Sequence, residues 1–553
     1  MLLLTLLACL HRADLAFTGG PVYTRAGAPA EALAVRGDRI VYVGDEAGLE
    51  PYLGRRTERI DLSGGALFPG FIDAHNHLLW SGTEGLDVDL YEATTLDELL
   101  AAIAERAEAS PDEPWVRGGG WDVSLFNASL NRGQLDAIVP DRPVYMSSAD
   151  GHSAWVNSRA LALAGVSAAT PDPPGGIIER DAAGEPTGVL REDAASLVSD
   201  LLPDYSRAQA AQGLRDAQSE ANGYGLTTVI DPFAEEWMLA AYRRADRGGR
   251  LTVRVYAALE VPGGDPARAV AEMDALRRRY SGGRLTINAG KLYIDGVIES
   301  KTARMIEPYA DGSNGELLYT DAALLATVLA LDAAGYQVHA HAIGDGAVRQ
   351  ILDAVAGLEA QRGPADRRPL IAHIEVIDPE DVPRFAALGA YADFQMLWAY
   401  PDPYITDWTI PFIGEERAKS LYPIGAVYQA GGTLVAGSDW SVSSMNPWEA
   451  IEVAVTRRDP VAGGEALSAE QAIPLEVAIA AYTEVGARAV FAEDCLGSLE
   501  VGKKADLVLV DRDPFTIDPT ELSEVRVLGT WMDGARVYGG RTRRLRRVWG
   551  CGG

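Results

Sequence analysis

The chain has 553 residues, of which 47% are hydrophobic, and its formal net charge is −30. This length is enough for two to four domains, or for one large α/β barrel with an accessory domain. The acidic balance argues against nucleic acid as a partner, because a polyanionic protein repels phosphate backbones.

The N-terminus opens with a short apolar run that ends in Leu6-Leu7-Ala8-Cys9. This pattern resembles a bacterial lipoprotein signal, which would send the chain to the cell envelope with a lipid anchor at Cys9 as its only membrane attachment. No lysine or arginine precedes the run, and an apolar leader on a cytoplasmic protein is the alternative. We therefore predict a leader over residues 1–13, and a disordered basic tail over residues 542–553.

Short segments of alternating polarity, punctuated by Gly and Asp, occupy both ends of the chain. Examples are "ALAVRGDRIVYVG" near the start and "ADLVLVDRDP" near the end. Alternation of this kind predicts β-hairpins. Because the middle of the chain lacks it, we predict one composite β-sandwich built from residues 14–66 and 495–541, flanking a central domain over residues 67–494.

The central domain alternates apolar strands with amphipathic helices. The predicted strands are Leu67–His77, Leu226–Asp231, Leu251–Leu259, Ile287–Gly296, Tyr336–Ala342, Leu370–Val376, Tyr391–Gln395 and Thr433–Asp439. Eight strand–helix units predict an α/β fold of the closed (β/α)8, or TIM-barrel, type. Roughly 150 residues, about 78–224, separate the first two strands, far more than a βα loop needs. This large insert is expected to fold as a cap over the barrel.

Two histidines, His75 and His77, end the first predicted strand. Residues i and i+2 of a strand share a face, so both imidazoles can reach one metal ion. A lone pair of this kind is a weak signal, and core packing explains many of them. The other strand ends strengthen it, since they carry His339 and His341, His373, and Asp439. Imidazoles with a carboxylate are the ligands that a borderline-soft divalent ion such as zinc prefers.

Lys291 lies inside the apolar stretch "INAGKLYIDG". Arginine outnumbers lysine in the chain by 44 to 5, so a lysine in a buried strand indicates a property that arginine lacks. Burial lowers the pKa of an amine, and a neutral amine can react with carbon dioxide to form a carbamate able to bridge two metal ions. The alternative is that Lys291 snorkels to solvent or pairs with Asp295 on the same face.

Ten stretches spread over about residues 14 to 540 resemble one protein family. They include "PGFIDAHNH", "GGGWD", "DGHSAWVNSRAL", "KLYIDGVIESKTA", "HAHAIGDGAV", "GSDW" and "GKKADLVLVDRDP". With them the chain resembles the amidohydrolase superfamily, in particular its large-insert branch of YtcJ-like and N-substituted-formamide-deformylase-like proteins (amidohydrolase family 3). One position departs from the family pattern: Ala372 stands where a glutamate often precedes the sixth-strand histidine.

The resemblance implies a centre of one or two divalent ions, with zinc as the expected metal. Its implied metal ligands are His75, His77 and Asp439 for one ion, His341 and His373 for a second, and an N-carboxylated Lys291 between them. His339 is expected to be a neighbour of the centre only. In the insert, His152 is implied as a catalytic donor to the transition state, and His152, Trp121 and Asp122 as residues that bind the substrate. A place in the hydrophobic core of the insert is the equal alternative for Trp121, since aromatic side chains mostly report burial.

The implied activity is hydrolysis of a non-peptide C–N bond in a small-molecule amide, formamide or cyclic amide. Asp439 would act as general base toward a metal-activated water and return the proton to the leaving nitrogen. Hydrolysis of an ester or lactone fits the same machinery. A metal-dependent isomerase that uses Asp122 or Asp150 as a further acid or base, and a non-catalytic envelope-bound binding protein, stay open. So does a homodimer as the assembly.

Overall fold

The computed structural model describes residues 12–25, 29–126 and 129–540. The predicted signal at Leu6–Cys9 and the predicted tail lie outside these residues. The chain divides into two compact units, one up to Leu78 and again from Gln218 onward, and one over Leu79–Ala217. Within the described part of the chain, no helix is both long enough and apolar enough to cross a membrane.

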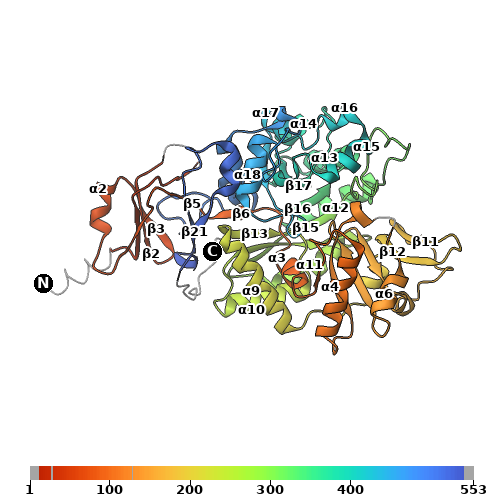
Figure 1. Cartoon of the computed structure of the whole chain (residues 1–553). Coiled ribbons are helices and arrows are strands. Elements are labelled where there is room, and N and C mark those ends of the chain that lie inside the picture. Colours follow the sequence, from red (N-terminus) through yellow and green to blue (C-terminus); the bar gives the residue numbers. More distant parts are fainter. Residues whose placement is uncertain (1–11, 26–28, 127–128, 541–553) are drawn as a thin grey trace. The chain divides into compact units, whose positions relative to one another are not determined.

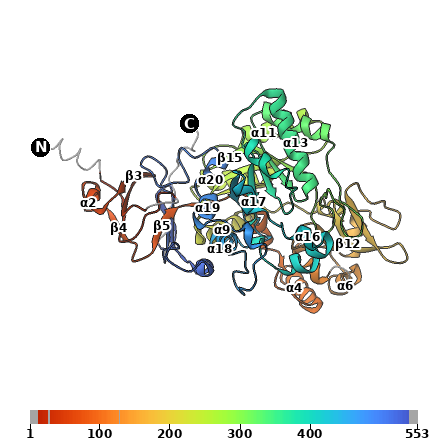
Figure 2. The same ribbon diagram turned by 90° about the horizontal axis from the view of Figure 1, so that it is seen from above.

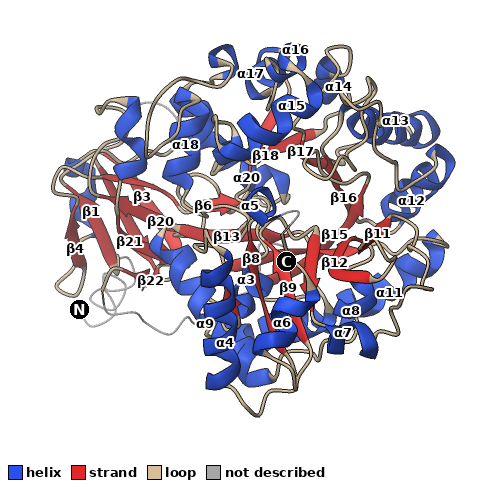
Figure 3. Ribbon diagram, turned by 45° about the vertical axis from the view of Figure 1, so that its right-hand side comes forward, coloured by secondary structure: helices blue, strands red, loops and turns tan. Residues whose placement is uncertain are grey.

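An eight-stranded parallel sheet forms the centre of the first unit, with its strands in sequence order. The strands are β6 (Phe71–Asp73), β13 (Leu226–Asp231), β14 (Arg254–Glu260), β15 (Leu285–Tyr293), β16 (Gln337–Ala342), β17 (Leu370–His373), β18 (Tyr391–Phe394) and β19 (Thr433–Ala436). The helices between them include α10 (Glu236–Arg247), α11 (Pro266–Tyr280), α12 (Asp321–Ala333), α13 (Asp345–Arg362), α14 (Val382–Ala387) and α17 (Ile424–Gln429). Figure 3 shows α12, α13, α14 and α17 on the outer side of β16 to β18. The predicted (β/α)8 barrel is confirmed.

The barrel closes where its first and last strands meet. Just beyond β6 and β19, the Ala74 amide donates to the Ala436 carbonyl at 2.9 Å, and the Asp439 amide donates to the His75 carbonyl at 2.7 Å. Gly437 permits this approach, because a Cβ there would lie 2.7 Å from the His75 amide nitrogen. Helix α20 (Glu484–Ala489) contacts both strands and lies beside α19 (Leu475–Ala481), which in turn contacts α18 (Pro447–Thr456) (Figure 2). The chain tips after β6 and β19 are therefore neighbours.

The predicted first strand, Leu67–His77, is two strands in the structure. Its first part, β5 (Ala66–Pro69), pairs antiparallel with β20 (Leu507–Val510), and only β6 belongs to the barrel. The change of partner occurs at Gly70, where a Cβ would lie 2.3 Å from the Thr227 hydroxyl oxygen. A continuous apolar run does not reveal such a change of sheet, since both strands are buried.

Two four-stranded sheets form a sandwich from the two ends of the chain. One is ordered β3-β2-β1-β4 and the other β22-β21-β20-β5. The strands not yet given are β1 (Leu15–Thr18), β2 (Ala32–Arg36), β3 (Arg39–Gly44), β4 (Glu58–Asp61), β21 (Val527–Met532) and β22 (Ala535–Tyr538). Their shared core joins Phe17 to Trp531, whose rings meet edge to face at 5.1 Å. In Figure 1 the red and blue ends of the chain meet in these sheets, as a composite domain requires.

Buried ion pairs connect barrel strand β14 and the chain before β15 to the C-terminal strands. Arg254 donates to Asp506 at 2.6 Å and also to Asp533. Arg284 donates to the same Asp533 carboxylate at 2.7 Å. All four side chains are buried, so removal of one partner would leave an uncompensated buried charge. Such a charge strongly destabilises the folded protein.

The second unit contains its own six-stranded sheet, ordered β11-β12-β10-β9-β8-β7. Its strands are β7 (Val88–Asp89), β8 (Val116–Trp121), β9 (Val144–Ser148), β10 (Ser153–Val156), β11 (Gly176–Arg180) and β12 (Pro186–Glu192). The unit's main helices are α4 (Leu96–Ala109), α6 (Arg132–Ile138) and α7 (Ser158–Leu163). Helix α4 begins with a capping box between Thr95 and Glu98, which satisfies the first main-chain N–H groups. The insert is thus a folded unit with its own core.

Candidate metal centre

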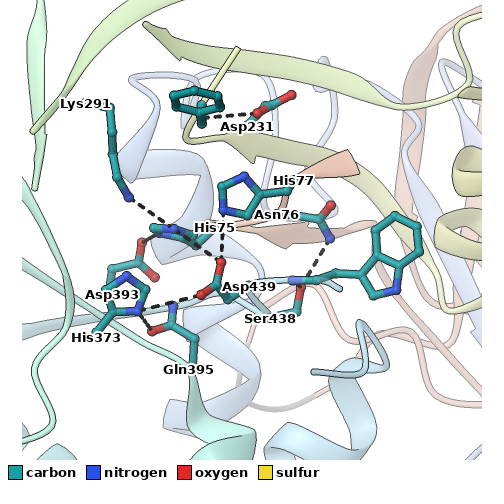
Figure 4. Close-up of polar contacts among 12 residues, drawn as sticks. His75, Asn76, His77, Asp231, Lys291, His373, Asp393, Gln395, Ser438 and Asp439 are labelled. Carbon is teal, nitrogen blue, oxygen red and sulfur yellow. Dashed lines mark hydrogen bonds and ion pairs between the residues drawn. The ribbon is translucent and has the colours of Figure 1, made fainter. Parts of the chain in front are cut away.

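Three side chains from the first and last barrel strands come together at the strand ends. The Nε2 atom of His77 lies 3.1 Å from Oδ1 of Asp439, and Nε2 of His75 lies 3.6 Å from the same oxygen. Figure 4 shows both imidazoles turned toward this carboxylate. One ligand atom from each residue lies within 4.8 Å of the other two, as the ligands of one ion must. Asp439 has a φ of 54°, a left-handed turn that gives its side chain this direction.

The electrostatics of Asp439 suit a cation. Burial alone would raise the pKa of this carboxyl, but contact with His77 and the charges of His373 and Lys291 outweigh it and lower the pKa below its usual value. Its Oδ1 atom is buried and accepts no well-aligned hydrogen bond from the described residues. A buried anionic oxygen beside two imidazole nitrogens, with no hydrogen bond among the described residues, leaves room for a further partner, and a divalent ion bound by N and O ligands would supply one. The residues therefore fit a metal.

The Lys291 amine lies at the same place. Its side chain is fully buried on β15, and Nζ is 3.4 Å from Nε2 of His75 (Figure 4). Burial lowers the pKa of Lys291 to about 8, although the negative charges of Asp439 and Asp393 act to raise it. An amine with this pKa is neutral far more often near pH 7 than an exposed lysine. Its uncharged form is the one that reacts with carbon dioxide.

Asp295, the alternative partner of Lys291, is engaged elsewhere. Its carboxylate accepts main-chain N–H groups from Arg304 at 2.8 Å, Ile343 at 3.0 Å and Gly344 at 2.9 Å. These bonds tie the loop after β15 to the loop after β16. Lys291 neither snorkels to solvent nor forms an ion pair with Asp295 among the described residues.

His341 and His373 lie next to each other beside this group, with ring centroids 4.5 Å apart. Nε2 of His341 is 3.1 Å from the Gly296 carbonyl, and Nδ1 of His373 is 2.7 Å from Oε1 of Gln395. The His373 ring also stacks on Trp398 at 5.6 Å. These contacts fix both rings near the centre, although neither ring belongs to the tight groups of candidate ligands found among the described residues.

His339 is closer to the centre than the motif predicts. Its Nε2 atom is 3.0 Å from Nδ1 of His75, and both atoms lie 3.6 Å from Oδ2 of Asp393. His75, His339 and Asp393 form the second tight group of candidate ligands, and all three are fully buried. Asp393 was not among the residues predicted to form the centre. The available signal was a lone carboxylate in the apolar stretch "AYADF" of β18.

A second buried carboxylate holds the two strand tips in register. Asp73 accepts the Ser438 hydroxyl at 2.6 Å, the Ser438 amide at 3.0 Å and the Asn76 side-chain amide at 2.8 Å. Burial raises the pKa of Asp73 to about 6, although these hydrogen bonds oppose the shift. Asp73 lies two residues before His75, and Ser438 directly precedes Asp439. The hydrogen bonds thus set the spacing of the ligand pair.

The three predicted substrate-binding residues lie in the second unit. Trp121 is fully buried in that unit's core, and its indole N–H donates to the Met146 carbonyl at 3.0 Å. Asp122 accepts the Ser124 amide at 2.7 Å. Nδ1 of His152 is 2.8 Å from Oε2 of Glu192, a pairing across the sheet that fixes the orientation of the imidazole.

A protein-family model, the amidohydrolase family, matches residues 58–538 of this chain. YtcJ of Bacillus subtilis is 32% identical over 533 residues, which cover 94% of this chain and 98% of YtcJ. The N-substituted formamide deformylase of Arthrobacter pascens is 30% identical over 92% of this chain and 95% of its own. The crystal structure of a metal-dependent hydrolase from Pyrococcus furiosus superimposes with a TM-score of 0.71, at 26% identity over 91% of this chain and all of that one.

Proposed function

This chain belongs to the amidohydrolase family and is a metal-dependent amidohydrolase, and from that premise we propose that it hydrolyses a non-peptide C–N bond. The proposed substrate is a small amide, formamide or cyclic amide. The observation that carries the proposal is the convergence of His75, His77 and Asp439 on one point at the ends of β6 and β19. The deformylase of Arthrobacter pascens supports the choice of bond through its name and its full-length similarity.

We assign the centre to zinc, because neutral imidazoles with a carboxylate match its preferred ligands. Burial lowers the pKa of His75 well below its usual value, so this imidazole is neutral and able to bind through Nε2. An ion held there would supply a hydroxide nucleophile near neutral pH and polarise the substrate carbonyl. A second ion would use His341 and His373, whose rings lie next to each other with centroids 4.5 Å apart.

Lys291 is proposed to carry the carbamate between these ion sites. Its Nζ lone pair would form a bond to the carbon of carbon dioxide, with loss of one N–H proton to solvent. The product is an anionic carboxylate on Nζ, the atom that lies 3.4 Å from Nε2 of His75. Arginine at this position could not form this group.

Asp439 is the proposed proton carrier of the reaction. Its lowered pKa keeps the carboxylate ionised, and Oδ1 accepts no aligned hydrogen bond that would compete for a proton. In the first step the carboxylate, through the oxygen that does not hold the ion, would take the proton of the attacking water. In the second step it returns that proton to the leaving nitrogen as the C–N bond breaks. His77, 3.1 Å away, holds the carboxylate in position for both transfers.

Metal removal and restoration test the proposed function. The purified full chain is assayed on a panel of N-formyl amines, N-acyl amines and cyclic amides, with esters and lactones of matched size. We expect turnover of at least one C–N substrate, its loss after dialysis against a strong chelator, and its recovery on addition of zinc. Turnover that survives complete metal removal, or turnover of esters and lactones alone, would contradict the proposal.

A further inference from the structure

The two tight groups of candidate ligands share His75 and use opposite nitrogens of its ring. Nε2 faces Lys291 at 3.4 Å and Asp439 at 3.6 Å, whereas Nδ1 faces His339 at 3.0 Å and Asp393 at 3.6 Å. A neutral imidazole has one nitrogen with a lone pair and one with a hydrogen. A neutral His75 can therefore bind an ion through only one of its ring nitrogens. The hydrogen on the other nitrogen then needs an acceptor on the opposite side of the ring.

Burial decides which side holds the ion. On the Nε2 side, the side chains of His77 and Asp439 are 12% and 10% exposed, so this side is in contact with solvent. On the Nδ1 side, His339 and Asp393 are both 0% exposed. An ion bound between them would have no open position for water or substrate, which a catalytic metal needs. The Nδ1 side is therefore the supporting side.

The supporting side contains an incomplete hydrogen-bond arrangement. Neither carboxylate oxygen of Asp393 has a hydrogen-bond partner among the described residues, although the side chain is fully buried. An unsatisfied buried carboxylate is costly. Two ring nitrogens, Nδ1 of His75 and Nε2 of His339, lie 3.6 Å from the same oxygen. A shift of about 0.8 Å would turn both 3.6 Å contacts into hydrogen bonds of about 2.8 Å.

We propose that Asp393 is a positioning residue that accepts the Nδ1 hydrogen of His75 and so directs the Nε2 lone pair to the metal. His339 alone cannot ensure this, because an imidazole can donate or accept at Nε2. Oδ2 of Asp393 lies on the Nδ1 side of His75, and an accepting oxygen there selects the tautomer of His75 whose hydrogen is on Nδ1. A carboxylate behind a metal-bound histidine fixes the ring and strengthens it as a ligand. His339 donates its own Nε2 hydrogen to the same oxygen and holds Asp393 in place.

The inference rests on the proposed function only in that an ion binds at Nε2 of His75. The test therefore measures zinc binding, not hydrolysis. The dissociation constant for zinc is determined on the metal-free full chain by competition with a chromogenic chelator. We expect Asp393→Asn to weaken zinc binding by about 10- to 100-fold, the range seen when such a supporting partner is lost. The unfolding temperature of the metal-free variant should stay near that of the wild type.

A buried aspartate outside the centre provides the matched control. Asp246 on α10 pairs with Arg243 and Arg284, and Asp246→Asn should leave the zinc dissociation constant unchanged even if it lowers the unfolding temperature. His339→Gln, which keeps an N–H donor, should weaken zinc binding less than Asp393→Asn does. If Asp393→Asn fails to fold, His339→Gln still tests the proposal. Its zinc dissociation constant should then rise by less than about tenfold, and a larger rise would contradict the proposal.

Two results separate the possible failures. If the wild type binds no zinc, the metal centre of the proposed function is wrong, and the inference falls with it. If the wild type binds zinc and the folded Asp393→Asn variant binds it equally well, the positioning role alone is wrong. A loss in His339→Gln as large as in Asp393→Asn would likewise contradict the assignment of the accepting role to Asp393.

Discussion

Replacement of Asp439 by asparagine is expected to lower kcat/KM by about 10³-fold on the best amide of the substrate panel. Asparagine retains the size of the side chain but cannot take a proton from water or return it to the leaving nitrogen. It also removes the negative charge that faces His75 and His77 at 3.6 and 3.1 Å. Steady-state kinetics on zinc-loaded enzyme, with zinc content measured in parallel, separate the loss of proton transfer from the loss of metal.

The matched control for this prediction is Asp353→Asn. Asp353 is an exposed aspartate on α13 whose ion pair with Arg384 lies at the surface, so the same change of charge should leave kcat/KM unchanged. A folded Asp439→Asn variant that keeps more than roughly a tenth of wild-type kcat/KM would exclude this carboxylate as the general base.

Replacement of Lys291 by arginine is the second change with a large expected effect. The guanidinium stays positively charged and cannot form a carbamate, so the bridge between the two proposed ion sites is lost. We expect zinc content to fall by about one ion per chain, and kcat to fall by about 10²- to 10³-fold through the loss of metal-based charge stabilisation. Zinc analysis and steady-state kinetics on the same preparation measure both effects.

Lys419→Arg is the control for this change, because Lys419 is an exposed lysine paired with Glu416 at the surface. The carbamate itself can be seen by carbon NMR after incubation with ¹³C-labelled bicarbonate, as a resonance present in the wild type and absent from Lys291→Arg. Retention of both zinc ions and full activity in Lys291→Arg would contradict the bridging role.

The sequence predicted the barrel well because its signals are local. Seven of the eight predicted apolar runs, such as those that contain "LTTVID" in β13 and "LIAH" in β17, each became one parallel strand in the expected order. The split at Gly70 was not predicted, since a change from one sheet to another leaves both halves of the run buried. Strand ends differ from the predicted ones by a few residues, because hydrogen bonding and not hydropathy ends a strand.

The centre was predictable in part, for the same reason. His75, His77 and Asp439 follow strands in recognisable motifs, and the structure brings them together. Asp393 and the contact of His339 with His75 were not predicted, because they depend on which side chains face each other across the inside of the barrel. That geometry arises from long-range packing of β6, β16 and β18, which no local pattern records. A lone aspartate in an apolar strand was the only signal.

The central claim is that an ion binds where β6 and β19 end. Anomalous X-ray diffraction at the zinc absorption edge, on crystals of the zinc-loaded full chain, tests it most directly. The account predicts an anomalous peak about 2.0–2.2 Å from Nε2 of His75, a ring nitrogen of His77 and a carboxylate oxygen of Asp439. A zinc-loaded crystal with no peak there, or with its peak between Nδ1 of His75, His339 and Asp393, would contradict it.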